Sequence, residues 1–196
     1  MDEKVALVMV TLGHLSVEHD RQTYLERIVD LCAQATDAER ATVYVVDREQ
    51  RELRSAVAQR APEIRLPLGH GLAGHVASTG ETINVPDAYA DARFDSTVDR
   101  VTGFRTTNIL AVPVWGERGS EVAGVIQVLN KRGGAFERHD QMLLERIAQA
   151  LGPALLAKKV QRCIVFWGRE RRFRLRLRQP SLVSFRVGDF FKGSAR

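Results

Sequence analysis

The order of residue patterns along the chain predicts an α+β domain in which helices pack on one central antiparallel sheet. Apolar residues recur at helical spacing in residues 20–39 and again after residue 136. Three short alternating segments between residues 41 and 68 predict a strand meander, and two further strand-like runs follow at 108–116 and 121–130. With 196 residues, 44% of them hydrophobic, the chain is long enough to bury one substantial core.

Two helices are expected at the N-terminal end. Residues 3–13 are rich in apolar residues, and we expect residues 1–19 to form a separate helix that is a dimer surface or linker, or that simply packs on the core. Asp20 is a candidate N-cap for the next helix. The apolar positions of that helix are Tyr24, Leu25, Ile28, Leu31, Cys32 and Ala35.

The middle of the chain predicts three strands, then a short helix. The segments "ATVYVVD", "RELRSAVAQ" and "EIRLPL" are β-branched or alternating, as strands of a meander are. The glycine-rich turn at 69–74 leads into a helix near "AGHVAST", and Gly80 stands where that helix is expected to stop. Glycines before a helix start also expose backbone N–H groups that can hold an anion, although an ordinary turn explains them too.

Residues 84–107, which we call the lid, form a long polar segment with little regular pattern. Loops of this length in a compact domain are either functional lids or disordered. Several apolar residues favour the former, because they can anchor the segment over a ligand pocket. These residues are Tyr89, Phe94, Val98, Val101 and Phe104.

The stretch "LNKRGGAFERHDQ" predicts a turn between the last strand and a long helix. Gly133 and Gly134 allow the chain to reverse, and Asp140 is favoured near a helix N-terminus. We expect Lys131 and Asp140 to form a structural clasp, the alternative being a solvated surface pair. The apolar stripe of the helix comprises Leu143, Leu144, Ile147, Ala150, Leu151, Ala154, Leu155 and Ala157.

Charge divides the chain into a mildly acidic domain and a basic tail. Residues 162–196 contain ten basic and two acidic residues, which leaves nineteen basic and twenty-two acidic residues elsewhere. The basic residues of the main domain do not cluster, which argues against a nucleic-acid-binding face there. We treat 161–196 as a basic tail: a following module cut short, a fragment that packs on a partner, or a sequence that is not selected to fold. The alternation from Phe173 to Arg178 predicts a strand within it.

Residues 20–160 resemble a GAF domain. The matching segments are "GLAGHVASTGETINVPDAYADARFDSTVDRVTGFRTTNILAVPV" and "GVIQVLNK", followed by Phe136 and Asp140. Asn130, Lys131, Phe136 and Asp140 resemble the NK, F, DE signature of this family, with Gln141 in place of the final acid. The resemblance is strongest to the cyclic-nucleotide-binding GAF domains of class I cyclic nucleotide phosphodiesterases and of bacterial adenylate cyclases.

The resemblance implies a set of ligand-binding residues. It places the backbone of Leu72 and Ala73 against a cyclic phosphate, and Gln127 on the strand under the base or ribose. It makes pocket or lid residues of Asp95, Asp99, Thr102 and Thr106, for which a local turn or cap is the alternative. Positions where the family often presents an aromatic residue and a base-reading group fall near Ala58 and Gln59. Ala58 offers no stacking face, whereas the Gln59 amide can pair with a purine edge.

We therefore expect a small-molecule-sensing regulatory module that binds cAMP or cGMP and signals through its terminal helices; the alternative is a ligand-free dimerisation scaffold. Its partners would be a second copy and an output domain or signalling protein. We expect no enzyme, no cofactor other than the nucleotide ligand and no metal site, because Cys32 and Cys163 and the five histidines lack ligand spacing. The apolar runs are too short for a membrane span and no signal peptide is apparent, so the expected location is the cytoplasm.

Overall fold

The computed structural model describes residues 3–15, 21–61, 63–116, 119, 121–156, 166–167, 172–175 and 183–186. The chain divides into two compact units, Met1–Leu155 and Leu156–Arg196. Asp20, Ala157 and Cys163, which the sequence singled out, lie outside the described residues, and the side chain of Ala154 is not described either.

The first unit is built on a six-stranded sheet in the order β3-β2-β1-β6-β5-β4. Every neighbouring pair is antiparallel, which confirms the predicted fold class. The strands are β1 (Ala38–Asp47), β2 (Glu52–Ala58), β3 (Arg65–Pro67), β4 (Ile83–Val85), β5 (Ile109–Trp115) and β6 (Val122–Lys131). The first three strands form the expected meander.

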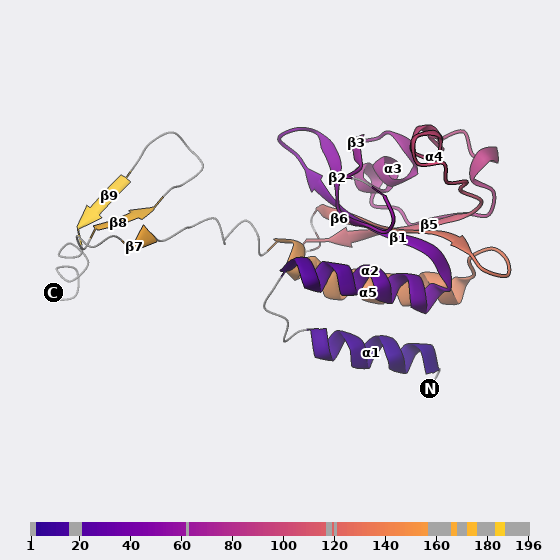
Figure 1. Ribbon diagram of the computed structural model, residues 1–196, viewed down its shortest axis with the longest axis horizontal. Helices are drawn as coiled ribbons and strands as arrows, with labels where there is room; N and C mark the ends of the chain where they lie inside the picture. The colour runs from indigo at the N-terminus through magenta and orange to yellow at the C-terminus, as the bar shows by residue number, and fades with distance from the viewer. Residues whose placement is uncertain are drawn as a thin grey trace. The chain divides into compact units, whose positions relative to one another are not determined.

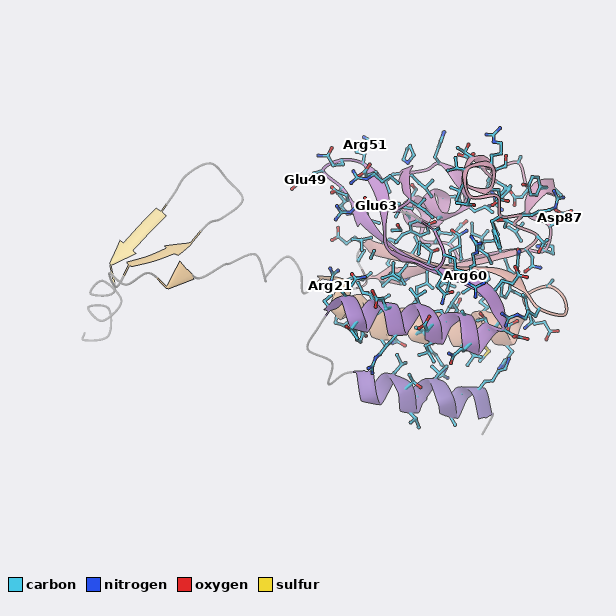
Figure 2. All side chains as sticks on the ribbon, viewed as in Figure 1. Arg21, Glu49, Arg51, Arg60, Glu63 and Asp87 are labelled. Carbon is cyan, nitrogen blue, oxygen red and sulfur yellow. The ribbon has the colours of Figure 1, made fainter. Side chains whose placement is uncertain are left out.

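Helices cover both faces of this sheet. They are α1 (Glu3–Leu15), α2 (Arg21–Thr36), α3 (Gly71–Thr79), α4 (Thr97–Thr102), α5 (Arg138–Leu156) and the 3-10 turn η1 (Ala88–Ala90). Helices α2 and α5 lie on one face with α1 outside α2, whereas α3 and α4 lie on the other (Figure 1). The exposed charges of the β1–β2 turn, such as Glu49, and of the lid, such as Asp87, lie at opposite ends of the unit (Figure 2).

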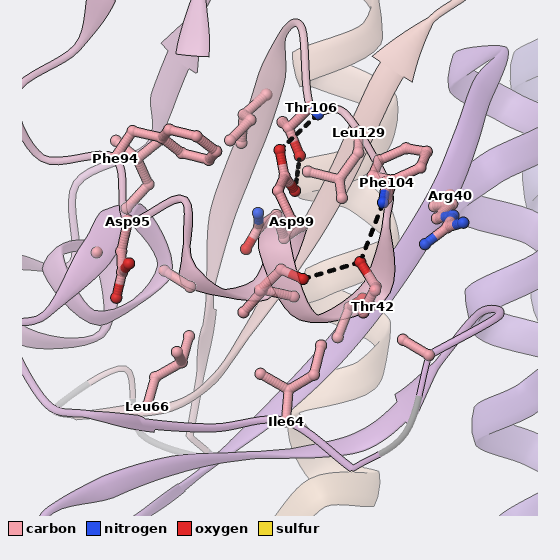
Figure 3. A pocket seen from close by; sticks show the side chains of 18 of the residues that line it. Arg40, Thr42, Ile64, Leu66, Phe94, Asp95, Asp99, Phe104, Thr106 and Leu129 are labelled. Atoms are coloured by element: carbon pink, nitrogen blue, oxygen red, sulfur yellow. Dashed lines mark hydrogen bonds between the residues drawn. The ribbon is translucent and has the colours of Figure 1, made fainter. Parts of the chain in front are cut away.

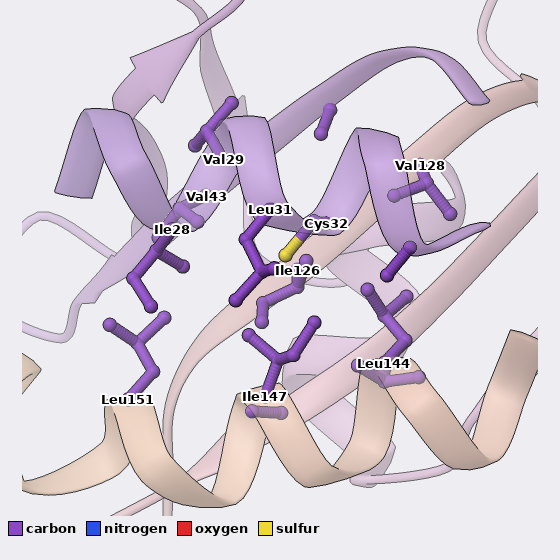
Figure 4. Close-up of a cluster of buried hydrophobic side chains, with 14 of the residues drawn as sticks. Ile28, Val29, Leu31, Cys32, Val43, Ile126, Val128, Leu144, Ile147 and Leu151 are labelled. Carbon is purple, nitrogen blue, oxygen red and sulfur yellow. The ribbon is translucent and has the colours of Figure 1, made fainter. Parts of the chain in front are cut away.

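The larger hydrophobic core lies between the sheet and the pair α2 and α5 (Figure 4). Because side chains alternate along a strand, Ile126 and Val128 of β6 point into this core, and they meet Cys32 of α2 and Ile147 of α5. Each large apolar side chain buried here stabilises the fold by about 1.5–3 kcal/mol. Burial also raises the pKa of the Cys32 thiol, so this cysteine is a packing residue and not a nucleophile.

The predicted apolar stripe of α5 is correct at most of its described positions. Leu143, Leu144, Ile147, Leu151 and Leu155 are buried. The prediction is wrong for Ala150, which is exposed. Ala148 is buried instead, because it follows Leu144 by four residues and so lies on the same helical face.

The opposite face of the sheet carries a smaller core. Leu72 and Val76 of α3 pack there with Ile83 of β4, Ile109 of β5 and Val125 of β6. This core holds α3 and the start of the lid against the sheet. It does not extend under the whole lid, and the space that remains is the candidate site described below.

The lid contains more regular structure than the sequence predicts. Ile83–Val85 forms the edge strand β4, which pairs with β5, and the chain then makes η1 and α4 before Gly103, which ends α4 with φ 67°. Helix α3 starts at Gly71, two residues earlier than expected. Gly80 ends α3 as expected, with φ 73° and its N–H donating to the Val76 carbonyl.

The second unit contains a small antiparallel sheet. Its strands β7 (Phe166–Trp167), β8 (Arg172–Leu175) and β9 (Val183–Arg186) pair in that order. The predicted strand at 173–178 coincides with β8 over residues 173–175, and residues 176–178 lie outside the described part. In neither unit is a described helix long and apolar enough to cross a bilayer.

Candidate ligand-binding pocket

A hollow of about 70 Å³ lies between the sheet, the start of α3 and the lid. Its walls come from β1, the β2–β3 region, α3, the lid, β5 and β6 (Figure 3). The structure brings together around it all eight residues that the sequence suggested: Gln59, Leu72, Ala73, Asp95, Asp99, Thr102, Thr106 and Gln127.

The floor of the hollow is the face of the sheet that points away from α2 and α5. On β6, Gln127 and Leu129 alternate with core residues and so point toward the lid. Thr42 of β1 stands directly opposite Gln127 in the strand register. Tyr44 lies two residues further along β1, and burial raises the pKa of its hydroxyl group. The floor thus combines apolar surface with an amide and two hydroxyl groups.

One wall is the amino end of α3. The side chains of Leu72 and Ala73 are only 3% and 2% exposed, because they pack in the smaller core. What these residues can offer a ligand is therefore their backbone N–H groups. The His70 side chain makes no capping hydrogen bond to this end of the helix, where the helix dipole favours negative charge.

Asp99 fastens the lid from within. Its carboxylate accepts hydrogen bonds from the Thr106 N–H and the Thr106 hydroxyl, both at 2.7 Å (Figure 3). It also accepts one from the Tyr89 hydroxyl at 3.1 Å. Asp99 is 6% exposed and Thr106 2%. In this structure both residues hold the lid closed, and their polar atoms point at each other.

Asp95 and Thr102 make the local contacts that the sequence left open as an alternative. The Thr97 N–H donates to Asp95 Oδ1 at 2.8 Å, and the Thr97 side-chain hydrogen bond is the main reason that the pKa of Asp95 is lowered. The Thr102 hydroxyl donates to the Val98 carbonyl at 2.8 Å. Both residues line the hollow while stabilising α4.

Gln59 lines the hollow, but its amide is bonded to the protein at both ends. Its Oε1 accepts from the Ala41 N–H at 3.0 Å, and its Nε2 donates to Asp30 Oδ1 at 2.6 Å. Gln59 would have to give up one of these partners to pair with a base edge.

Sequence reasoning missed two polar residues of β1, Arg40 and Thr42. Arg40 is the single basic side chain among the described residues that line the hollow, and its guanidinium lies 3.7 Å from the centroid of the Phe104 ring. Thr42 lies beside it on the same face of β1 (Figure 3). The available signal was the alternation of Arg40, Thr42 and Tyr44, which begins one residue before the predicted strand.

The end of β6 is tied to the start of α5. Lys131 Nζ contacts Asp140 Oδ2, and the same oxygen accepts from the Glu137 N–H at 2.7 Å. Asp140 is 1% exposed, so this pair is not a solvated surface pair. Phe136 is 4% exposed, and its carbonyl accepts from Asn84 Nδ2 at 2.8 Å.

Asn130 connects this turn to the lid. It adopts a left-handed conformation with φ 57°, which asparagine tolerates better than most residues. Its Nδ2 donates to the Arg105 carbonyl at 2.9 Å, and its Oδ1 accepts from the Thr107 N–H at 2.7 Å. The last residues of the lid are thus bonded to the last residues of β6.

The family to which the chain belongs is shown by comparison with known proteins. The family model for the GAF domain matches residues 20–155. This chain belongs to the GAF domain family.

Curated relatives of this GAF domain include cyclic nucleotide phosphodiesterases. The chain is 33% identical over 157 residues to a probable 3',5'-cyclic phosphodiesterase of Caenorhabditis elegans. This match covers 71% of this chain and 21% of that protein. It is 34% identical over 136 residues to a dual 3',5'-cyclic-AMP and -GMP phosphodiesterase of Drosophila melanogaster. This match covers 69% of this chain and 8% of that protein. The chain therefore matches only a minor part of each of these relatives.

Solved structures share the fold of this GAF domain. A GAF domain from a phosphoenolpyruvate-protein phosphotransferase of Coxiella burnetii superposes with a TM-score of 0.73 at 16% identity, covering 80% of this chain and 95% of that one. A free methionine-R-sulfoxide reductase from Neisseria meningitidis superposes with a TM-score of 0.66 at 22% identity, covering 82% and 95%. These likenesses establish the fold alone.

Within the described part of this GAF domain, no group of three or more His, Cys, Asp or Glu side chains is arranged to hold a metal ion.

Proposed function

We propose that this GAF domain is a regulatory sensor that binds a cyclic nucleotide, cAMP or cGMP, in the hollow under the lid. The observation that carries the proposal is the hollow itself, because it gathers backbone N–H groups, hydroxyls and amides around an apolar floor. Ligand sites have this composition, with a few polar groups set in apolar walls. The phosphodiesterase relatives, whose names refer to cyclic nucleotides, support this ligand class.

In this proposal each part of the ligand meets a different wall. The cyclic phosphate lies at the amino end of α3, against the N–H groups of Leu72 and Ala73. The ribose lies under the lid, near Thr102 and Thr106. The base lies over Gln127, where amide and hydroxyl groups can both donate and accept hydrogen bonds.

The lid must open for a ligand of this size. Pockets for ligands of drug-like size have volumes of about 300–1,000 Å³, whereas the hollow holds about 70 Å³. The lid side chains Phe94, Val98 and Phe104 border the hollow, so their outward movement enlarges it. Opening requires the Asp99 hydrogen bonds to Thr106 and Tyr89 to break or rearrange.

Movement of the lid is transmitted, in this proposal, through Asn130. Its side chain bonds the lid at Arg105 and Thr107, and the next residue, Lys131, is paired with Asp140 in the first turn of α5. Asn108 adds a second link, because its Nδ2 donates to the Gly134 carbonyl at 3.1 Å. A change in the lid thereby alters the start of α5, and the helices α1 and α5 carry it to a second copy and to an output domain.

We further propose that the chain regulates and does not catalyse. The match to the phosphodiesterases covers only 21% and 8% of their lengths, and the GAF domain accounts for residues 20–155 of this chain. We therefore do not propose for this chain the catalytic activity that the names of these relatives describe.

Titration calorimetry with cAMP and with cGMP tests ligand binding. Gln127→Leu removes the amide from the floor with little change in volume and should weaken binding about tenfold or more. Gln34→Leu makes the same chemical change on the exposed side of α2, away from the hollow, and should bind as the parent protein does. Equal affinities in the two variants would show that the ligand binds elsewhere.

A ligand-free dimerisation scaffold is the second candidate. It is favoured by the internal hydrogen bonds of Asp99 and Gln59, which leave few free polar groups in the hollow. Helix α1 exposes Met9 and Val10 at 55% and 60%, a surface that a second copy can cover. Sedimentation of the chain with and without residues 1–19 tests this candidate. An unchanged number of chains in the sedimenting species would exclude α1 as the dimer surface.

A further inference from the structure

Asp95 brings a negative charge to the place where the proposed function needs an anion. It lies in the lid just before α4 and borders the hollow (Figure 3). A Cβ placed on Gly71, the first residue of α3, would lie 3.8 Å from the Asp95 Cβ. The carboxylate is therefore a close neighbour of the helix end that is assigned above to the cyclic phosphate.

The charge of Asp95 is fixed in position by its own turn. Thr97 N–H donates to Oδ1, and this bond holds the side chain against the start of α4. The charged neighbours that act on Asp95 are Arg100 and His70, and both favour its ionised form. Asp95 is exposed, so solvent weakens but does not remove its effect on a charge a few Å away.

A cyclic phosphate carries one negative charge, so the α3 end attracts it while Asp95 repels it. Asp99, the other acid that borders the hollow, is already bonded to three donors inside the lid. The one basic side chain among the described residues of the lining, Arg40, belongs to β1 and lies beside Phe104 (Figure 3). Arg40 therefore does not offset the charge of Asp95 at the start of α3, and Arg100 and His70, which act on Asp95, do not border the hollow.

From this placement we infer that Asp95 is a specificity-determining residue that weakens the binding of ligands with an anionic group at the α3 end. It thereby sets the threshold concentration at which the module responds to a cyclic nucleotide. The inference rests on the proposed function, because it concerns the charge preference of the same site. Ionised Asp95 therefore lowers the affinity for a nucleotide relative to the affinity for a neutral nucleoside.

The test is the substitution Asp95→Asn, which removes the charge and keeps the oxygen that accepts from Thr97. Calorimetry should show cAMP or cGMP binding about three- to tenfold more tightly to this variant than to the parent chain. Adenosine and guanosine, which have no phosphate, should bind both proteins equally. Asp91→Asn is the matched control, since Asp91 also accepts from the N–H two residues ahead but does not border the hollow.

The outcomes separate this inference from the proposed function. If the parent chain binds a cyclic nucleotide and Asp95→Asn binds it equally or more weakly, the inference is wrong and the proposed function stands. If neither protein binds either cyclic nucleotide, both are wrong. An equal gain in affinity for Asp91→Asn would show a general effect of net charge and would also overturn the inference.

Discussion

The carboxylate of Asp99 accepts two hydrogen bonds from Thr106, one from its backbone N–H and one from its hydroxyl. The two residues flank the turn that closes the lid, and both are almost completely buried. This pairing holds the lid closed over the hollow. The balance between these internal bonds and bonds to a ligand decides whether the module can respond.

Replacing Asp99 with Asn should loosen the lid. The amide keeps one acceptor oxygen but places an N–H₂ group among donors from Thr106 and Tyr89, so a buried hydrogen bond is lost at a cost of about 1–3 kcal/mol. Urea denaturation should show this loss, and amides of residues 95–107 should exchange faster. Tyr89→Phe removes only the bond from a half-exposed side chain and should cost less. Equal stability of Asp99→Asn and the parent protein would refute the proposed role of Asp99 as a fastener.

The pair Lys131 and Asp140 should matter more than the adjacent pair Arg132 and Asp37. Lys131→Met leaves a carboxylate that is 1% exposed without its cation, which costs about 3 kcal/mol. Arg132→Met breaks a 3.2 Å pair whose side chains are 64% and 50% exposed, and should cost at most about 1 kcal/mol. Urea denaturation of both variants gives the comparison. Similar costs would mean that the lysine and aspartate pair contributes no more than a surface contact.

All three tyrosines should titrate late. Burial is the main cause that raises the pKa of Tyr24 and Tyr44; for Tyr89, which is 46% exposed, partial desolvation and the hydrogen bond to Asp99 raise it. A pKa that is higher in the folded than in the unfolded protein stabilises the fold. This stabilisation is complete at pH values below the pKa of an unfolded tyrosine, about 10, and is lost as the pH rises above it. Absorbance of tyrosinate should therefore appear at higher pH in native protein than in urea. Superimposed titration curves would contradict the assigned surroundings of these tyrosines.

The coupling between lid and α5 should depend on Asn130. Asn130→Gly keeps the left-handed backbone but removes the side-chain bonds to Arg105 and Thr107. A cyclic nucleotide should slow amide exchange in residues 138–142 of the parent protein and leave it unchanged in this variant. Asp37→Gly is the control, because Asp37 also has a positive φ of 54° but lies outside the lid. A response in residues 138–142 that survives Asn130→Gly would place the coupling elsewhere.

Residue patterns predicted the long elements well because those elements have one face in a core. The spacing of Leu25, Ile28 and Cys32 is enough to place α2, and the alternation around Ile126 is enough to place β6. The short elements β4 and α4 were not predicted, because they bury too few side chains to leave a pattern in the sequence. Ile83–Val85 contributes only two buried side chains, and α4 is held by turn bonds to Asp95 and Asp99 that periodicity does not reveal.

The site was predicted in part, through resemblance and not through periodicity. The eight suggested residues border one hollow, but whether each of them binds a ligand stays a prediction. Arg40 and Thr42 were missed because a polar residue on a strand can be assigned to a site only when the face it lies on and the strand register are known. The internal partners of Asp99 and Gln59 were equally hidden, since they come from contacts between distant segments and from turn geometry.

Hydrogen exchange of the lid in the presence of cAMP or cGMP tests the central proposal most directly. If a cyclic nucleotide enters the hollow and the lid closes over it, amides of residues 88–107 should exchange more slowly with one of the two ligands, and those on the exposed side of α2 should not change. Unaltered exchange of residues 88–107 at saturating concentrations of both nucleotides would contradict the account and leave the scaffold role in its place.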